Sequence, residues 1–443
     1  MIVTFGPAES GHGPLMWGQT AIWEVIRWMP PGDSSLNIPA SLDVPAHCSL
    51  DDIGSAVRTL IERHAALRTR LCGPEDEPHQ VVADSGSIDI TVEELTDGGL
   101  SAAEIGARLR EQPFDTAQDL PIRISVITRA GQPKQIVFSF SHVAVDGWSV
   151  AIVVRDLAKL LDGRTALDPR AQQPLQRAAY ERSPEAQRKA ARALRFWESA
   201  VRELPPVMLE DLRRQGRADL EWSEIQSDAL AAAARLLSAS ARIPSSLVIQ
   251  AATAAVLGSW LKENDVALRL IVATRFRPET QELVGPFNQN ALFRIVLREA
   301  EPFTSFLSRC GAANLRAYQH CEYEPRSLER LIAEVAAERG ITADGYCFFN
   351  DVRFDFGTPT GQPAETDPSA LRDRTRLRVP GFDIEQKGSK FFVYLHELAD
   401  TAKVTLCADR RFLDGRSAAE FLLAVEDLLV QESTSFAAVR PNP

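Results

Sequence analysis

Two stretches of the chain, 268 positions apart, share a pattern that limits what the chain can fold into. Residues 137–149 and 405–417 each read as an apolar strand, a loop that contains Asp-Gly, and the start of an amphipathic helix. The loop of the first stretch contains His142, and the same position in the second stretch holds Arg410. The repeat therefore predicts two similar α/β lobes, of which only the first carries an imidazole.

The hydrophobic periodicity alternates between strand and helix through both halves of the chain. It predicts helices over 51–67 and 149–161 and a strand over 135–140. Residues 164–184 are polar and proline-rich, which is typical of a linker between lobes. We therefore expect a first lobe over 1–175 and a second over 176–443.

The formal net charge is −11, and this balance excludes several classes of partner. Non-specific nucleic-acid binding and anchoring on an anionic membrane both require excess Lys and Arg, so neither is expected. The longest apolar stretch, 247–261, contains polar residues and predicts a buried helix rather than a membrane span. The six cysteines include no CxxC pair, which predicts reduced thiols in the cytoplasm and no metal site.

Residues 141–149 contain the pattern HxxxDG directly after an apolar strand. A strand end holds its backbone rigidly, so that His142 can be aimed, and imidazole exchanges protons near neutral pH. Gly147 lets a ligand approach the backbone closely, and its N–H could face a developing oxyanion. Asp146 is either a group that orients His142 or a buried structural ion. These residue types in this order indicate acid–base chemistry at His142.

The HxxxDG pattern resembles the signature of the chloramphenicol-acetyltransferase-like acyltransferases, and the rest of the chain resembles the condensation domains of nonribosomal peptide synthetases. Five further segments match that family's motifs in order: GQTAIW at 18–23, RHAALRT at 63–69, ATRFRPE at 273–279, VGPFNQN at 284–290 and HCEYEP at 320–325. The resemblance implies an α/β fold (α+β, two-layer) in which two acetyltransferase-like lobes form a V-shaped pseudo-dimer around a central tunnel.

The resemblance also implies roles for individual residues. His142 corresponds to the catalytic histidine, and Gly147 borders the reacting carbonyl. Asp146 pairs with Arg275 as a structural ion pair. The tunnel is expected to be lined by Ser141, Trp148, Ser149, Asn288 and Asn290. Two positions depart from the family pattern, because Ser141 replaces the first histidine of HHxxxDG and Ala21 replaces an arginine of the first motif.

The function implied is that of a freestanding condensation enzyme. It transfers an acyl or aminoacyl group from the phosphopantetheine thioester of a carrier protein to an amine or hydroxyl, and it needs no bound cofactor or metal. The carrier is expected to arrive in trans, and the acceptor is a small molecule or a second carrier-bound group. Two alternatives stay open: different chemistry on a tethered substrate (epimerisation, cyclisation or elimination), or a non-catalytic module that recruits a tailoring oxygenase. Such modules usually have a damaged HHxxxDG motif, whereas this chain keeps His142, Asp146 and Gly147.

A basic helix is expected after the linker, and it is a candidate contact surface for the carrier protein. Arg188, Arg192 and Arg195 are spaced to share one face of it. That face is either a solvated surface or a docking site for an acidic carrier protein.

Overall fold

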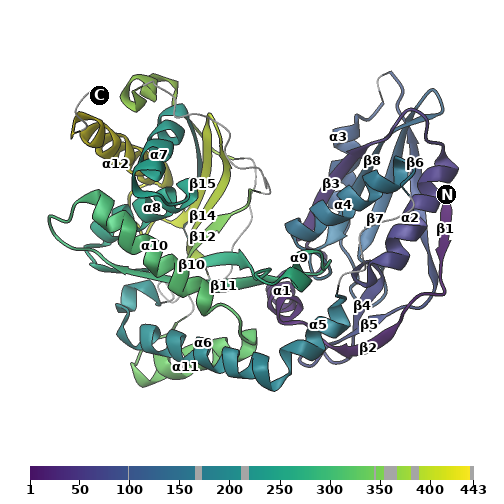
Figure 1. Cartoon of the computed structure of the whole chain (residues 1–443), viewed down its shortest axis with the longest axis horizontal. Helices are drawn as coiled ribbons and strands as arrows, with labels where there is room; N and C mark the ends of the chain where they lie inside the picture. The colour runs from purple at the N-terminus through teal and green to yellow at the C-terminus, as the bar shows by residue number, and fades with distance from the viewer. Residues whose placement is uncertain are drawn as a thin grey trace. The chain divides into compact units, whose positions relative to one another are not determined.

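The computed structural model describes residues 1–97, 99–164, 172–210, 219–343, 346–353, 367–380 and 389–439, with side chains described as far as 435. Within this range the chain divides into two compact units (Figure 1). Unit 1 comprises Met1–Arg188, Ala273–Gln289 and Glu324–Arg326, and unit 2 comprises Lys189–Val272, Asn290–Tyr323 and Ser327–Pro443.

Unit 1 is built on a five-stranded sheet of order β1-β6-β7-β8-β3 and a three-stranded sheet of order β2-β5-β4. Its elements are β1 (Ile2–Phe5), β2 (Gly11–Pro14), α1 (Trp17–Trp28), β3 (Asn37–Asp43), α2 (Leu50–Arg63), η1 (Ala65–Arg68), β4 (Thr69–Cys72), β5 (His79–Val82), β6 (Gly86–Glu94), α3 (Ala102–Arg110), β7 (Ile122–Arg129), β8 (Gln132–Ser141), α4 (Gly147–Leu161), α5 (Pro174–Glu181) and α9 (Pro278–Gln281).

Unit 2 contains a seven-stranded sheet of order β11-β10-β12-β14-β15-β9-β13. A long helix, α6 (Pro184–Glu203), runs from the end of unit 1 into unit 2. The other elements are η2 (Pro206–Met208), β9 (Leu220–Ser227), α7 (Asp228–Ala241), α8 (Ser245–Leu261), β10 (Asp265–Ala273), β11 (Asn288–Val296), α10 (Phe303–Gln319), α11 (Pro325–Glu338), β12 (Tyr346–Asp351), η4 (Pro368–Arg374), β13 (Arg376–Arg378), β14 (Ser389–Leu398), β15 (Ala402–Asp409) and α12 (Ala418–Val439).

The core of unit 1 lies between its large sheet and helices α2 and α4. Apolar residues alternate along β7 and β8, so that Ile124, Val126, Phe138 and Phe140 all point to one face and are buried. Helix α3 packs on the opposite face, where Ile127 and Val137 lie in a smaller cluster. This packing holds the end of β8, and with it the HxxxDG loop, on a rigid base.

The predicted elements agree with the observed ones, apart from their ends. Helix α2 begins with the predicted capping box, in which Ser49 and Asp52 bond each other's backbone N–H. The helix expected over 51–67 ends at Arg63, because His64 adopts an extended backbone with ψ 99° and a 3₁₀ turn follows. Helix α8 matches the predicted buried helix.

The two units repeat the same order of strands, as the sequence echo predicts. In unit 1, β6 pairs with β7 in parallel, and β8 pairs with β7 and β3 antiparallel. In unit 2, β12 and β14 are parallel, and β15 pairs with β14 and β9 antiparallel. Strand β8 ends at Ser141 and β15 ends at Asp409, which are 268 positions apart. A helix follows each of them, α4 in unit 1 and α12 in unit 2.

Unit 1 extends past residue 175, where the sequence predicts the boundary between the lobes. Helix α5 belongs to unit 1, where Glu181 accepts a hydrogen bond from the Trp17 backbone N–H of α1 at 2.7 Å. The segment Ala273–Gln289 also belongs to unit 1, although it is distant in sequence. Of the expected linker, residues 165–171 lie outside the described range.

No single described helix is long and apolar enough to cross a membrane. Helices α7 and α8 reach that length and composition only as a pair, and a bend of 104° separates them. Both have long runs of buried residues.

Candidate active site

His142 follows directly on the last residue of β8. Its Nδ1 lies 2.8 Å from the Val145 carbonyl oxygen, and a carbonyl can only accept a hydrogen bond. Nδ1 therefore carries the proton in the neutral ring, and Nε2 carries the lone pair. The loop folds back on itself through a second bond, from the Ala144 N–H to the Ser141 carbonyl. The backbone of HxxxDG thus fixes both the tautomer and the orientation of the half-buried imidazole.

Asn288, the first residue of β11, approaches the free nitrogen of His142. Its Nδ2 lies 3.5 Å from Nε2, at the outer limit of a hydrogen bond. Because this contact is weak, a hydrogen-bond donor of a ligand can displace it. Both residues belong to unit 1, so that unit alone assembles the pair.

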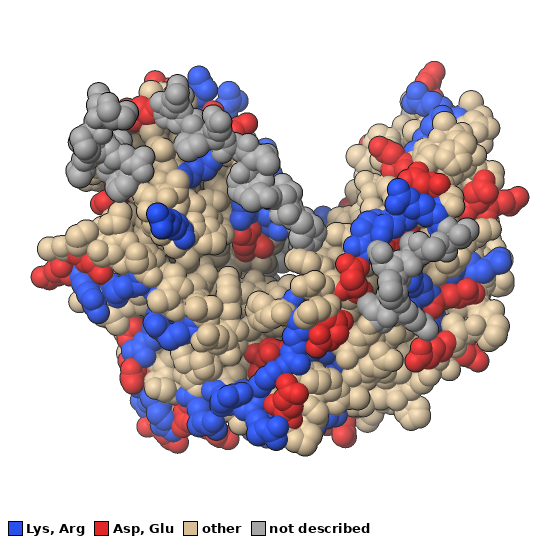
Figure 2. Space-filling model, in the orientation of Figure 1, with Lys and Arg blue, Asp and Glu red and all other residues tan. Residues whose placement is uncertain are grey.

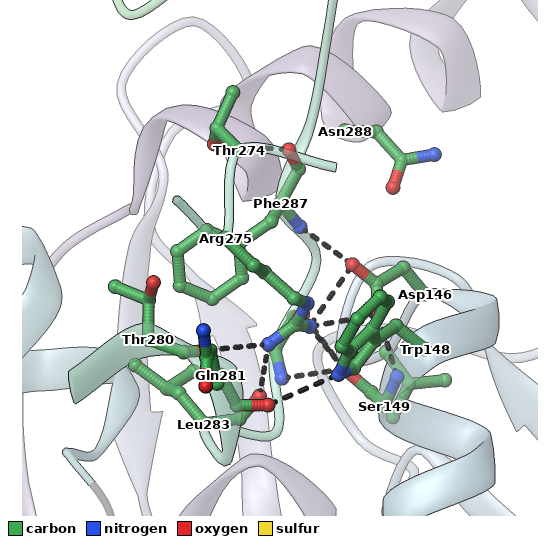
Figure 3. A network of polar contacts seen from close by, with 12 residues as sticks. Asp146, Trp148, Ser149, Thr274, Arg275, Thr280, Gln281, Leu283, Phe287 and Asn288 are labelled. Carbon is green, nitrogen blue, oxygen red and sulfur yellow. Dashed lines mark hydrogen bonds and ion pairs between the residues drawn. The ribbon is translucent and has the colours of Figure 1, made fainter. Parts of the chain in front are cut away.

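Asp146 forms the predicted ion pair with Arg275 (Figure 3). Arg275 Nη2 lies 2.9 and 3.0 Å from the two carboxylate oxygens of Asp146, and the side chains are 2% and 4% exposed. Asp146 is also the N-cap of α4, where it accepts from the Ser149 N–H at 2.7 Å. His142 bonds Val145 instead, so the geometry favours a structural ion over an orienting group.

The same ion pair ties the segment before Asn288 to the HxxxDG loop. Asp146 Oδ2 accepts from the Phe287 N–H at 3.0 Å, and Arg275 Nη2 donates to the Gly285 carbonyl at 2.9 Å. A further close contact comes from α1, because a Cβ on Gly18 would lie 1.9 Å from the Pro286 carbonyl oxygen. A side chain at position 18 would collide with this backbone oxygen. The first position of the GQTAIW segment therefore requires glycine in this chain.

The structure corrects the prediction for Ser149 and locates the other expected tunnel residues. Ser149 is fully buried, and its hydroxyl lies 2.7 Å from Asp146 and 2.8 Å from the Gly285 carbonyl, so it is a member of the ion-pair network rather than a tunnel wall. Ser141 is buried at the end of β8, and half-buried Trp148 donates its indole N–H to the Gln281 carbonyl at 3.0 Å. Asn290 belongs to unit 2, where its carbonyl accepts from the Tyr323 hydroxyl at 2.6 Å.

Sequence reasoning missed a second buried network on α4. Asp156 is 1% exposed and lies 3.1 Å from both Arg63 Nε and His64 Nε2. It also lies 2.9 Å from Arg155, which in turn pairs with Glu282 at 2.6 Å. Asp156, the one acidic residue of a mostly apolar helix, is the signal that could have revealed it, because buried carboxylates are almost always paired. The network connects the helix after HxxxDG to the segment that carries Arg275.

Asp156 gives unit 1 a predictable acid sensitivity. Burial acts to raise the pKa of Asp156, but hydrogen bonds from His64 and Arg155 outweigh burial and lower the pKa to about 2. A depressed carboxyl pKa stabilises the fold above the unfolded value near 4 and loses that effect as pH falls towards 2. Asp156→Asn should therefore lower the melting temperature at pH 7, and its deficit should shrink between pH 4 and pH 2. A deficit that stays constant across this range in thermal melts would contradict the assignment.

The matches to known proteins fall on the same segments as this site. The model of the condensation domain family matches residues 9–342, which include His142, Asp146, Arg275 and Asn288. The chain belongs to the condensation domain family. The resemblance noted from the sequence motifs is thereby confirmed, and so is the mixed α/β fold.

The curated relatives are synthetases longer than this chain, and the chain matches one part of each. The phosphinothricin tripeptide synthetase PhsC of Streptomyces viridochromogenes is 26% identical over 76% of this chain, which spans 32% of that protein. The AMB antimetabolite synthetase AmbB of Pseudomonas aeruginosa is 31% identical over 84% of this chain, which spans 30% of that protein. The chain thus covers about a third of the length of these relatives.

Solved structures share the fold at low sequence identity. SgcC5 of Streptomyces globisporus superposes with a TM-score of 0.69 at 17% identity, over 95% of this chain and 99% of that one. The X-domain from teicoplanin biosynthesis gives 0.69 at 18% identity, over 96% and 95%. The condensation domain of the polyketide synthase MokA gives 0.70 at 14% identity, over 96% and 98%. These likenesses show the fold alone.

Proposed function

We propose that this condensation domain transfers an acyl or aminoacyl group from a carrier-protein phosphopantetheine thioester to an amine or hydroxyl, in natural-product biosynthesis. The observation that carries the proposal is the hydrogen bond from His142 Nδ1–H to the Val145 carbonyl, which leaves Nε2 as an acceptor beside the Asn288 amide. A general base must present a lone pair to the proton that it removes. The amide or ester product follows from the acceptor that is used.

The proposed step balances as a single acyl transfer. The acceptor nitrogen or oxygen attacks the thioester carbonyl while His142 Nε2 takes its proton. A C–N or C–O bond forms, the C–S bond breaks, and the proton passes from Nε2 to the departing thiolate. Gly147 opens α4, so its N–H is among the first helical N–H groups, which have no carbonyl partner in the helix. It can donate to the oxyanion of the tetrahedral intermediate.

The non-catalytic alternative is weaker for this chain. An X-domain shares the fold as closely as SgcC5 does, so likeness of fold does not separate recruitment from catalysis. The local geometry does favour catalysis, since a recruitment module needs neither a fixed imidazole tautomer nor an amide beside Nε2. Epimerisation, cyclisation and elimination would use the same base without a second substrate, and the experiment below separates them.

Intact-mass spectrometry of a separately purified acyl carrier protein tests the proposal. The carrier is loaded with an acyl-phosphopantetheine and incubated with this protein, with and without a panel of amines and alcohols. We expect the carrier to lose the acyl mass only with a suitable acceptor, together with formation of the matching amide or ester. Epimerisation leaves the mass unchanged, elimination lowers it without an acceptor, and cyclisation releases the acyl group without one. Any of these results would replace the proposal, and success with a separate carrier would support delivery in trans.

Docking of the carrier requires a local positive surface, because carrier proteins of this kind are acidic and this chain carries −11. Arg188, Arg192 and Arg195 are exposed on α6. Figure 2 shows Lys and Arg side chains gathered along the lower edge of the molecule, where Figure 1 places α6. We propose this face as the dock, in a cytoplasmic setting.

Changing these three arginines to Glu should slow transfer from the carrier-bound donor about tenfold at low salt, because repulsion replaces attraction. Transfer from a small acyl-pantetheine thioester should be unchanged. The matched control is the triple change of exposed Arg129, Arg298 and Arg316 to Glu, which alters net charge equally elsewhere. Equal rates for the two triple variants with the carrier-bound donor would rule α6 out as the dock.

A further inference from the structure

Unit 1 contains a buried carboxylate that the proposed step does not use. Glu181 is the last residue of α5, and its side chain is 3% exposed. Its Oε2 accepts from the Trp17 backbone N–H at 2.7 Å, and its Oε1 accepts from Arg177 Nε at 2.9 Å. A buried carboxylate is costly unless its oxygens are bonded and its charge is paired, and Glu181 meets both conditions. The two bonds join the start of α1 to α5.

The bond to Trp17 leads to the segment before Asn288. Trp17 is the first residue of α1, and Gly18 is the second. A Cβ on Gly18 would lie 1.9 Å from the Pro286 carbonyl oxygen, so the start of α1 is in direct contact with this segment. One buried apolar cluster fills the place where they meet, and its members are Met16, Ala178, Leu283 and Phe287. A shift of the start of α1 would therefore displace Pro286.

The bond to Arg177 leads to the same segment. The Arg177 guanidinium lies over the Phe287 ring, with 5.3 Å between its central carbon and the ring centre. The Arg275 guanidinium lies over the same ring at 4.3 Å (Figure 3). Two positive charges beside one ring repel each other, and the carboxylate of Glu181 offsets the charge of Arg177. Phe287 is 2% exposed, so it has little room to move if this balance changes.

We infer that Glu181 is a positioning residue for acyl transfer, an inference that rests on the proposed function of His142. Its carboxylate holds the start of α1 and the Arg177 guanidinium against residues 286–287. Because Asn288 follows directly, the same contacts fix its amide beside His142 Nε2. Glutamine cannot replace Glu181, because an amide has one oxygen, and its NH₂ group would face the second donor.

Single-turnover transfer from a loaded carrier protein tests this role in Glu181→Gln. The assay is run at about pH 8.5, because burial raises the pKa of Glu181 to about 7 and the carboxyl must be ionised in the parent. We expect the rate at saturating carrier to fall about tenfold or more, since small displacements of reacting groups are costly. The KM for the carrier should stay within about twofold of the parent's, because Glu181 is buried and does not face the carrier. A Glu181→Gln variant with the parent's rate would overturn the inference.

Two further variants separate positioning from a loss of stability. Glu426→Gln changes a buried carboxylate of unit 2, which is 2% exposed and accepts from the hydroxyls of Thr375 and Ser227. It should keep the parent's rate per folded molecule. Arg177→Met/Glu181→Gln removes both charges and leaves the amide oxygen to accept from the Trp17 N–H, so it should recover to within about threefold of the parent. A double variant as slow as Glu181→Gln, or a Glu426→Gln variant equally slow, would overturn the inference.

Nitrogen-15 NMR of the side-chain amides tests the positioning without any acyl transfer. The Asn288 signals are identified by their loss in Asn288→Ala. We expect them to shift in Glu181→Gln, to return towards the parent's positions in Arg177→Met/Glu181→Gln, and to stay in place in Glu426→Gln. Unshifted Asn288 signals in Glu181→Gln would overturn the inference. If they shift as expected in a protein that transfers no acyl group, the proposed function fails while the positioning of Asn288 by Glu181 is supported.

Arg177→Lys takes the place of Glu181→Gln if that variant does not fold. Lysine keeps the charge but lacks the planar fork that bonds the carboxylate and lies over the Phe287 ring. The Asn288 signals should therefore shift in this variant as well, and unshifted signals would overturn the inference.

Discussion

His142→Ala should reduce acyl transfer by about 10²–10⁴-fold while leaving the melting temperature near that of the parent. The loss follows from removing Nε2, the only basic atom that the HxxxDG loop offers in the proposed step. Stability should hold because the half-buried side chain makes one bond within its own loop, to Val145, and a long contact to Asn288. Single-turnover rates with a loaded carrier protein, measured beside thermal melts, give both quantities.

The matched control is His79→Ala, which removes another half-buried histidine of unit 1, on β5. We expect it to retain the parent's transfer rate. A His142→Ala variant that transfers acyl groups as fast as His79→Ala would refute the catalytic assignment. A His142→Ala variant that melts far below the parent would indicate a structural role instead.

Asp146→Ala should destabilise unit 1 by about 3–5 kcal/mol and lower activity, because it leaves the Arg275 guanidinium buried without its counter-ion. Burial already lowers the pKa of Arg275, and Asp146 opposes this effect more strongly than Glu282 does. The same change removes the N-cap of α4 and the acceptor for the Phe287 N–H, which together position the residues on either side of His142. Denaturant unfolding with transfer assays would measure both losses.

Ser417→Ala separates the loss of a cap from the loss of a buried charge partner. Ser417 forms a capping box with Glu420 before α12 in unit 2, and within the described residues its hydroxyl bonds Glu420 and not an arginine. Its removal should cost only about 0.5–2 kcal/mol. The double variant Asp146→Ala/Arg275→Met should recover part of the stability that Asp146→Ala loses. Equal losses for Asp146→Ala and Ser417→Ala would show that the ion pair contributes little.

The residues of the site differ in how far the sequence reveals them. The order strand, HxxxDG, helix follows from local periodicity, so β8, the His142 loop and α4 are predictable. Asp146 and Arg275 are 129 positions apart in the sequence, and only the family resemblance predicts that they pair. The role of Ser149 was open to prediction, since an aspartate N-cap commonly bonds the backbone N–H three residues on. The mistaken tunnel assignment came from its place in the motif.

Other contacts leave no periodic signal in the sequence. The hydrogen bond from His142 to Val145 depends on how the loop turns. The pattern HxxxDG leaves the residue types at 143–145 open, and every residue type has a backbone carbonyl, so the sequence does not indicate this bond. Trp197 of α6 and Arg269 of β10 are neighbours in the core of unit 2. Nothing in the local sequence around either residue indicates this contact. The V-shaped arrangement of the lobes and the tunnel between them stay predictions from the family resemblance.

The central claim is that the fold presents the basic Nε2 of His142 to the acceptor, and nitrogen-15 NMR of the imidazole rings tests it most directly. The seven histidines are labelled, and the His142 signals are identified by their loss in His142→Gln. At a pH where the ring is neutral, we predict a protonated Nδ1 and an unprotonated Nε2, as the bond to the Val145 carbonyl requires. A His142 ring with its proton on Nε2 would contradict the account, because Nε2 would then have no lone pair with which to accept the proton, and the lone pair on Nδ1 would face the Val145 carbonyl.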